Sequence, residues 1–339
     1  MRNYIIRRLL LFPPTLIGVT LIAFFITRIV PGGPIERALA QSQMVDMAGG
    51  NSRTAGDNAA LSEEQLEQLK KLYGFDKPWP VAYVNWLGKV VTGDLGKSFR
   101  YHEPVTDLIL ERVPVALYFG LMMALVSYLV TIPLGIIKAL RHRTWFDNIS
   151  SAVVFGGYAV PGYALGALLV VYLCMRNDFF PKEGWPTDDF EDLGFFAQVW
   201  DLLYHSFLPL LCYVLGMFAF KTMLVKNQLM DNLAADYVRT AVAKGLPFRK
   251  AVVGHALRNS LIPIVTTLGQ LVTVFVAGSF LIEVVFDIDG IGLLGYTSLM
   301  DRDYPVVMGI LLISSGLMLL GNLLSDICVA IADPRVRFQ

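Results

Sequence analysis

The stretch Asp236-Tyr-Val-Arg-Thr-Ala-Val-Ala-Lys-Gly-Leu-Pro247 is the most clearly polar segment of a largely apolar chain. Asp236 is suited to cap a helix, and Lys244 suits its last turn. Gly245 supplies a left-handed cap after the helix, and Pro247 prevents its continuation. The pattern therefore predicts a helix of about two turns. Because such a short helix is marginal alone in water, we expect neighbouring structure or a partner to hold it.

The composition around this stretch is that of a membrane protein. Of the 339 residues, 55% are hydrophobic and only 17% are charged, which indicates a polytopic membrane chain in contact with lipid. The formal net charge of zero argues against a nucleic-acid partner, which normally requires a basic face. The cysteines lie in or at the end of apolar runs and are interpreted as packing residues: Cys174, Cys212 and Cys328.

Apolar runs long enough to cross a bilayer occur six times along the chain. They lie at about Leu9–Val30, Pro114–Ile137, Ile149–Met175, Ser206–Leu224, Leu261–Val285 and Val306–Ala332. The first run is long enough for a full span, and no small-residue cleavage site follows it, so it is interpreted as an uncleaved span and not as a signal peptide. The sequence thus predicts an all-α membrane protein with about six transmembrane helices.

The distribution of Lys and Arg predicts the orientation of these spans. The basic residues of the short loops fall on one side: Arg2, Arg7, Arg8, Arg141, Arg143, Lys226, Arg239, Lys244, Arg249, Lys250, Arg258, Arg335 and Arg337. Basic loops stay in the cytoplasm, so both termini and the segment from Asp236 to Asn259 are expected there. The expected organisation is a first span in 1–30, an extracytoplasmic loop with short helices in 31–113, and a core of five spans in 114–339 that includes a cytoplasmic segment at 226–260.

The long extracytoplasmic loop carries a helix-start signal. Ser62-Glu-Glu-Gln65 has the pattern of a capping box, and Leu61 and Leu66 can form the flanking hydrophobic staple. This predicted helix could receive a delivery protein, or it could pack its apolar face on its own chain. The sequence leaves both alternatives open.

Several residues within the apolar runs are candidates for shaping a pathway. Prolines that can kink a helix occur at Pro133, Pro161, Pro209 and Pro263. Lys221 is expected to snorkel toward the cytoplasmic interface, because a charge at mid-membrane costs about 2.5–3.5 kcal/mol. Glu283 and Asp326 are surrounded by apolar residues. Each could line a wet path or serve as a structural polar anchor.

Motifs for chemistry within this chain are missing from the sequence. Gly96-Lys-Ser98 resembles the end of a phosphate-binding loop, but Val91 occupies the position of the required earlier glycine. No zinc-protease pattern, nucleophile elbow or Cys/His cluster occurs in the 339 residues. We therefore expect a non-catalytic chain that binds no metal or cofactor of its own.

The polar stretch, followed by His255-Ala-Leu-Arg-Asn-Ser-Leu-Ile-Pro263, resembles the cytoplasmic loop motif of ABC-importer permeases of the dipeptide and oligopeptide class. Further similar motifs run almost from end to end: Tyr4-Ile-Ile-Arg-Arg-Leu, Pro31-Gly-Gly-Pro34, Tyr73-Gly-Phe-Asp-Lys-Pro78, Gly93-Asp-Leu-Gly-Lys-Ser98, Arg302-Asp-Tyr-Pro305 and Asp333-Pro-Arg335. Within that class, Leu281-Ile-Glu-Val-Val-Phe286 and Gly290-Ile-Gly-Leu-Leu-Gly-Tyr296 are most similar to B-type permeases of the Yej subgroup, importers of peptides and of the peptide-nucleotide antibiotic microcin C.

The resemblance implies a multi-pass protein of the bacterial inner membrane. It implies four kinds of partner: a second permease, a cytoplasmic ABC ATPase that binds ATP and Mg²⁺, an extracytoplasmic peptide-binding protein and the peptide itself. The short helix would insert into a groove of the ATPase. Its implied coupling residues are Asp236, Tyr237, Arg239, Thr240, Ala241, Lys244, Gly245, Leu246 and Pro247, of which Tyr237, Ala241 and Leu246 would pack and Arg239 and Lys244 would make polar contacts.

Two other classes of function compete with this interpretation. A self-sufficient secondary transporter or channel often has broken helices in paired repeats and ionisable residues at mid-membrane, for which Glu283 and Asp326 are scattered candidates. A helix-turn-helix DNA reader could be built on the turn at Gly245-Leu-Pro247. The neutral chain and the adjoining spans disfavour the DNA reader.

Overall fold

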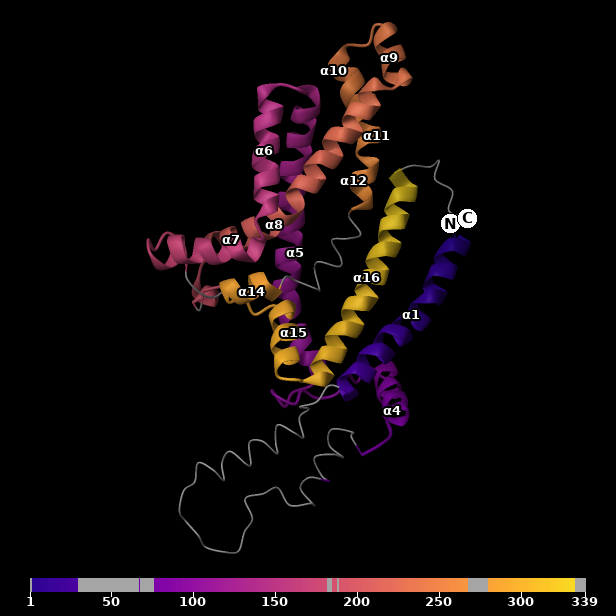
Figure 1. Cartoon of the computed structure of the whole chain (residues 1–339), viewed down its shortest axis with the longest axis vertical. Helices are drawn as coiled ribbons and strands as arrows, with labels where there is room; N and C mark the ends of the chain where they lie inside the picture. Colours follow the sequence, from indigo (N-terminus) through magenta and orange to yellow (C-terminus); the bar gives the residue numbers. More distant parts are fainter. Residues whose placement is uncertain are drawn as a thin grey trace, which may run out of the picture. The chain divides into compact units, whose positions relative to one another are not determined.

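The computed structural model describes residues 2–29, 67, 76–181, 185–187, 189–267 and 280–332. Within these ranges the chain is helical, apart from turns, irregular segments and one isolated antiparallel bridge between Lys97 and Pro104 (Figure 1). The prediction of an all-α protein is confirmed. The predicted capping box at 62–65 lies outside the described residues.

Four helices are long and apolar enough to cross a membrane: α1 (Arg2–Ile29), α5 (Val105–Leu140), α8 (Phe195–Ala234) and α16 (Tyr304–Ala332). A bent pair is a fifth candidate: α6 (Trp145–Ala159) with α7 (Gly162–Leu169) and its π-helical continuation η1 (Val170–Met175). The predicted run Leu261–Val285 includes residues 268–279, which lie outside the described ranges. The count of six and the sidedness of the spans stay predictions.

The bend in this pair occurs at Pro161, one of the four prolines singled out in the sequence. Val160 has an extended backbone (φ −93°, ψ 122°) and Pro161 precedes the first residue of α7. A proline disfavours helical geometry in the residue before it, so α6 ends here and the next helix leaves at 89°. By contrast, Pro133 and Pro209 lie inside the continuous helices α5 and α8.

Helix α8 extends further than the apolar run that predicted it. The run ends at Leu224, whereas the helix continues to Ala234. Lys226, which the charge pattern assigns to a loop, is therefore a helical residue, and its side chain is buried. Hydropathy marks the apolar part of a helix and not its end, because a polar turn can continue the same backbone hydrogen bonding.

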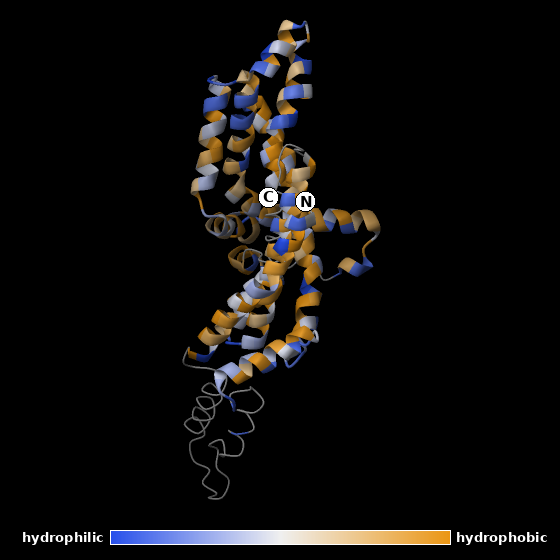
Figure 2. Cartoon of the chain, turned by 90° about the vertical axis from the view of Figure 1, so that its right-hand side faces the viewer, coloured by the Kyte–Doolittle hydropathy of each residue, from blue (hydrophilic) through white to orange (hydrophobic). Residues whose placement is uncertain are grey.

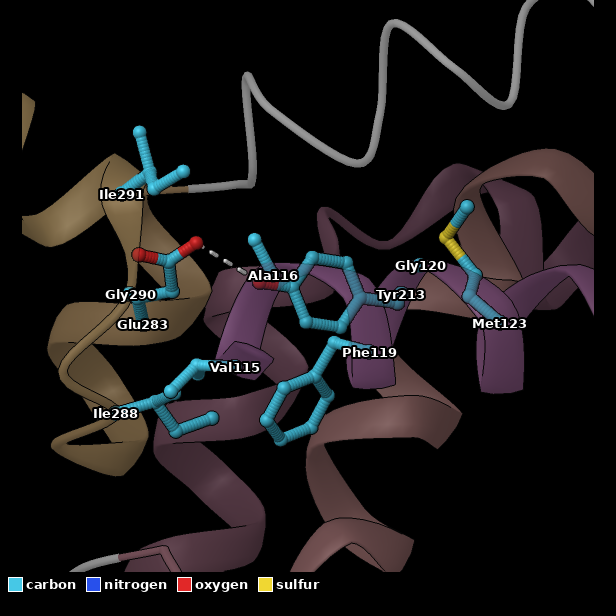
Figure 3. Close-up of a pocket in the computed structure, with 10 residues that line it drawn as sticks. All are labelled: Val115, Ala116, Phe119, Gly120, Met123, Tyr213, Glu283, Ile288, Gly290 and Ile291. Carbon is cyan, nitrogen blue, oxygen red and sulfur yellow. Dashed lines mark hydrogen bonds between the residues drawn. The ribbon is translucent and has the colours of Figure 1, made fainter. Parts of the chain in front are cut away.

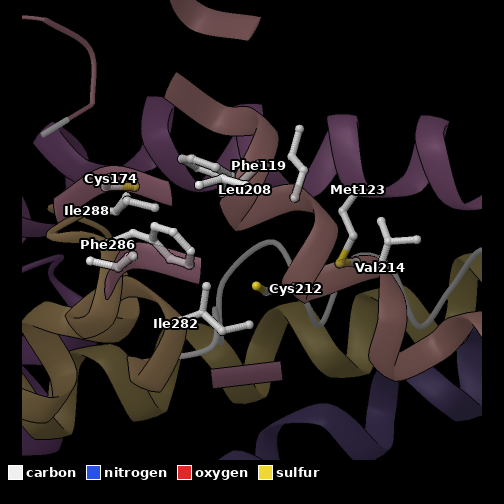
Figure 4. Close-up of a cluster of buried hydrophobic side chains, with 11 residues drawn as sticks. Phe119, Met123, Cys174, Leu208, Cys212, Val214, Ile282, Phe286 and Ile288 are labelled. Carbon is white, nitrogen blue, oxygen red and sulfur yellow. The ribbon is translucent and has the colours of Figure 1, made fainter. Parts of the chain in front are cut away.

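The chain divides into two compact units, which are described separately. Unit 1 comprises Met1–Leu9, Arg112–Leu294 and Gly316–Gln339, and unit 2 comprises Leu10–Glu111 and Gly295–Ser315. The core of unit 1 joins α5, η1, α8 and α14 (Phe280–Phe286) through a cluster that includes Phe119, Met123, Cys174, Leu208, Cys212, Ile282 and Phe286 (Figure 4). The predicted packing roles of Cys174 and Cys212 are confirmed, since both are almost fully buried in this cluster.

Unit 2 contains α4 (Trp79–Val91), which packs on α1 through Phe24 and Tyr83. The turn after Ser98 is held by the buried carboxylate of Asp303, which accepts hydrogen bonds from the Ser98 hydroxyl and from the backbone N–H groups of Phe99 (3.0 Å) and Arg100 (3.2 Å). The Asp303 carboxylate thus accepts three hydrogen bonds from the turn between Ser98 and Arg100.

Unit 1 also contains the short 3₁₀ helix η2 (Phe190–Asp192) and a run of five short helices: α9 (Asp236–Ala243), α10 (Phe248–Ala251), the π-helix η3 (Val252–Leu257), α11 (Arg258–Ser260) and α12 (Ile262–Thr266). These five helices form the connection at the far end of α8, which we call the α9–α10 connection (Figure 1). Figure 2 shows hydrophobic residues along most of the long helices and frequent hydrophilic residues around this connection. The polar stretch predicted from the sequence therefore forms a distinct structural feature.

Candidate functional site

Helix α9 begins at a sharp change of direction after α8. Ala235 has an extended backbone (φ −72°, ψ 146°) and occupies the N-cap position. Asp236 is the first helical residue, and its carboxylate makes no capping hydrogen bond but lies 3.8 Å from the Arg239 guanidinium. The prediction that Asp236 caps the helix is wrong because the break falls one residue earlier. Its carboxylate still lies in the first turn, where the helix dipole favours a negative charge.

The end of α9 is closed by two backbone hydrogen bonds of a Schellman motif. Gly245 N–H donates to the carbonyl of Val242 at 2.9 Å, and Leu246 N–H donates to that of Ala241 at 3.1 Å. Gly245 has φ +89°, a left-handed conformation that side chains disfavour. The predicted left-handed cap is confirmed, and Lys244 is the C-cap residue just beyond the last turn.

Pro247 then occupies the N-cap position immediately before α10 (φ −54°, ψ 136°). Its carbonyl accepts a hydrogen bond from Ala251 N–H at 3.0 Å. The end of α9 and the start of α10 are therefore separated by only four residues, 244–247. This geometry gives the connection a defined shape despite the shortness of each helix.

The inner face of α9 is fixed by a buried apolar cluster, which we call the α9 anchor. Val238, only 2% exposed, is its contribution from α9. The other buried members come from four elements around it: Ala139 of α5, Leu229 of α8, Ala251 of α10 and Ala256 of η3. Leu246 packs partly buried against the same cluster. The anchor satisfies the expectation that neighbouring structure holds the short helix.

Polar contacts tie both ends of the connection to α8. The Tyr237 hydroxyl donates to Asn232 Oδ1 at 2.5 Å and accepts from Asn259 Nδ2 at 3.1 Å. Ser260 Oγ donates to the carbonyl of Gln228 at 3.1 Å. These hydrogen bonds attach the connection to Gln228 and Asn232 in the last two turns of α8.

The outer face of α9 and α10 remains exposed. Of the predicted coupling residues, Asp236, Tyr237, Arg239, Thr240, Lys244, Gly245 and Pro247 are exposed, while Ala241 and Leu246 are partly buried. Tyr237 and Val242 are each 40% exposed and Phe248 is 56% exposed. Sequence reasoning missed two features here, the inward anchor Val238 and the outward Phe248. Amphipathic spacing around Val238 was the available signal for the first.

Glu283 lies in the interior of unit 1, at 5% exposure. Its Oε2 accepts a hydrogen bond from Leu293 N–H at 2.7 Å, and its Oε1 accepts one from the Tyr213 hydroxyl at 3.4 Å. The carboxylate faces Gly290 and Gly292 so closely that a Cβ at Gly290 would lie 2.5 Å from Oε2. Glu283 lines a cavity of about 20 Å³ together with Val115, Phe119 and Ile288, about the room needed by one water molecule. Figure 3 shows these side chains.

We expect Glu283→Leu to destabilise the protein by about 1–3 kcal/mol, because the Leu293 amide loses its carboxylate acceptor inside the protein. Glu283→Gln keeps an oxygen acceptor of the same shape and is the matched control. The measurement is the thermal unfolding midpoint of each purified variant in detergent. Equal midpoints for Glu283→Leu and wild type would contradict this role.

Asp326 joins the ends of the chain that belong to unit 1. Its Oδ2 accepts a hydrogen bond from the Tyr4 hydroxyl at 2.8 Å and lies 2.9 Å from Arg8 Nη2. Both carboxylates that the sequence singled out thus contact other parts of the protein. The geometry favours the structural alternative for each over a path through the membrane.

Lys221 corrects another expectation. Its side chain does not snorkel: it is 4% exposed, and its Nζ donates to Ser127 Oγ at 3.1 Å. The same Nζ lies 4.3 Å from the centre of the Tyr128 ring. The ammonium is therefore stabilised by a hydroxyl and an aromatic face on α5.

Comparison with known proteins places the chain in a family. The family model described as "Binding-protein-dependent transport system inner membrane component" matches residues 131–338, which include the whole α9–α10 connection. The chain belongs to this family of inner-membrane transport components. The family assignment agrees with the several apolar helices long enough to span a membrane.

Relatives match this permease over its full length. It is 36% identical to the peptidoglycan transport system permease protein YejB of Agrobacterium fabrum, with 100% of this chain and 99% of the relative covered. It is 37% identical to the inner membrane ABC transporter permease protein YejB of Escherichia coli O157:H7 and 33% identical to the oligopeptide transport system permease protein AppB of Bacillus subtilis, each with 100% of both chains covered. The predicted resemblance to this class of permeases and to its Yej subgroup is confirmed.

Proposed function

We propose that this chain is the membrane-spanning permease subunit of an ATP-driven importer for peptides or peptide-containing compounds. Its full-length relatives are named for the transport of oligopeptides, dipeptides and peptidoglycan. A family defined by dependence on a binding protein supports uptake, because such a protein collects substrate outside the membrane. Peptide-like antibiotics of the microcin C type belong to the same substrate class.

The observation that carries the coupling role is the shape of the α9–α10 connection. It combines an inner face fixed by the α9 anchor with an outer face exposed at Tyr237, Val242 and Phe248. A short helix that projects an apolar and polar face from a rigid base suits insertion into a groove. We assign that groove to a cytoplasmic ATPase, whose nucleotide-driven closure would push α9 and, through it, α8.

An external energy source is needed for such a cycle. Moving a two-state population from 1:99 to 99:1 requires a differential interaction of about 5.5 kcal/mol. ATP and Mg²⁺ bound in the partner ATPase would supply it, with a second permease completing the pathway and an extracytoplasmic binding protein delivering the peptide. This chain would contribute no catalytic residue.

Affinity purification of the C-terminally tagged chain from its native membrane tests this proposal. We expect a second permease and an ATPase to co-purify, and the reconstituted complex to take up labelled di- and tripeptides only when ATP is present on the ATPase side. A chain that purifies alone and still moves peptides in vesicles without ATP would contradict the proposal and favour a secondary transporter.

A further inference from the structure

A buried ion cluster involves lysines that are close in sequence to residues of the α9 anchor. Asp147, at 3% exposure, stands in the first turn of α6 between two buried lysines, Lys138 of α5 and Lys226 of α8. Lys226 Nζ reaches both carboxylate oxygens, at 2.7 and 2.8 Å. Lys138 Nζ lies 3.1 Å from Oδ1. One carboxylate thus connects three helices.

Neighbouring polar groups form further hydrogen bonds with Lys138 and Asp147. Lys138 Nζ also donates to the carbonyl of Asp147 at 2.9 Å and to the hydroxyls of Ser150 and Ser151 at 2.8 Å each. Arg143 N–H donates to Asp147 Oδ2 at 3.2 Å, and His142 Nδ1 lies 3.3 Å from the same oxygen. Burying charges is unfavourable unless their hydrogen bonds are met, and here the carboxylate and the Lys138 ammonium have several partners each.

The cluster adjoins the α9 anchor on two helices at once. Lys138 is followed by Ala139, an anchor residue of α5, and Lys226 lies one helical turn before Leu229, the anchor residue of α8. The two helices also meet closely beside the cluster, since a Cβ on Gly135 would lie 2.6 Å from the Cβ of Val225. A force applied to α9 would therefore reach α5 and α8 close to the ion pairs of Lys138 and Lys226 with Asp147 of α6.

We propose that Lys138, Asp147 and Lys226 form an ionic clamp that makes α5, α6 and α8 move as one body when α9 is displaced. This inference rests on the proposed coupling function. In it the three side chains are positioning residues, which touch neither substrate nor nucleotide. Without the clamp, α8 would follow α9 while the α5–α6 hairpin lagged behind.

Lys226→Met is the informative variant. It removes the link to α8 but leaves Lys138 and Asp147 as a balanced pair with their other hydrogen bonds, so the hairpin is expected to stay folded. In the assembled transporter, we expect ATP hydrolysis to continue while uptake of labelled di- and tripeptides falls about tenfold, the scale of mutations within a coupling network. Lys226→Arg, which keeps the charge, is expected to restore most of the uptake.

Lys221→Met is the matched control, because it removes another buried amine from α8 that has hydroxyl and aromatic contacts but no carboxylate among them. It is expected to keep uptake within about twofold of wild type. An equal loss in both variants would overturn the clamp, as would normal uptake by Lys226→Met. A parallel fall of uptake and ATP hydrolysis in Lys226→Met would also overturn it and leave only a structural role.

Distance measurements between spin labels supply a readout that does not depend on the substrate. Labels at the exposed positions Val153 of α6 and Asn227 of α8 are expected to keep one distance when ATP is added to the wild-type complex, and to change distance in Lys226→Met. If ATP leaves the distance unchanged in both the wild type and Lys226→Met, the clamp is contradicted but the proposed function is not. A wild-type chain that assembles with no ATPase would instead overturn the proposed function on which the clamp rests.

Discussion

Replacing Gly245 with valine is expected to reduce peptide uptake by at least about tenfold while leaving the chain in the membrane. Gly245 has φ +89°, and no atom lies within 4 Å of the position that a Cβ would take. The free-energy cost of valine at this position therefore comes from the backbone conformation and not from steric crowding. A β-branched residue in this region of backbone space costs about 1–3 kcal/mol, which a short helix end can avoid by unwinding.

Unwinding would change the surface that α9 presents. Both hydrogen bonds of the Schellman motif, from Gly245 and Leu246, depend on the left-handed residue. Their loss would release the last turn and change the direction in which Pro247 starts α10. The proposed contact with the ATPase would then be lost, whereas the spans are expected to remain intact.

Gly254→Val is the matched control for this experiment. Gly254 lies in η3 of the same connection, its Cβ position is also open, and its backbone is not left-handed. Uptake, ATP hydrolysis and the amount of each variant in the membrane are measured side by side. Normal uptake by Gly245→Val, or an equal loss in Gly254→Val, would contradict a special role for the turn.

Local features of the sequence predicted where α9 ends, but they did not predict which residues pack around it. The turn at Gly245 and Pro247 follows from backbone preferences of single residues, so its geometry could be read in advance. The start was misplaced by one residue because Asp and the extended Ala235 compete for the same position. The inward direction of Val238 depends on Leu229 and Ala251, which lie on other elements.

The sequence also did not predict which charged residues far apart in the chain form ion pairs. Lys226 contributed to the predicted orientation as a loop residue, yet it is a buried partner of Asp147, 79 residues earlier. The amino-acid type indicates which side of a membrane a lysine prefers, but not whether a carboxylate on another helix neutralises it. The bend of 89° at Pro161 was likewise foreseeable as a kink, whereas its size depends on how α7 packs against α8 at Gly162.

Replacing Asp147 with asparagine is expected to be the most destabilising of the substitutions considered, at about 3–5 kcal/mol. Asparagine keeps the size of the side chain and an oxygen for Arg143 N–H, but it leaves Lys138 and Lys226 as two buried cations without a carboxylate between them. Removing one partner of a buried ion pair costs more than the pair contributes, because the remaining charge stays desolvated. The yield of folded protein after detergent extraction and its unfolding midpoint should both fall.

Asp289→Asn is the control for Asp147→Asn, because it removes the carboxylate of a different, more exposed ion pair. Asp289 Oδ1 lies 2.8 Å from Arg112 Nε, and the side chains of Asp289 and Arg112 are 67% and 12% exposed. Asp289→Asn therefore leaves one partly exposed cation in place of two buried ones, so we expect a smaller loss of stability than in Asp147→Asn. The double variant Asp147→Asn with Lys226→Met should recover part of the stability, because it removes one excess charge while Lys138 keeps the hydroxyls of Ser150 and Ser151. Equal midpoints for Asp147→Asn and Asp289→Asn would mean that burial of the charges does not decide the stability of this cluster.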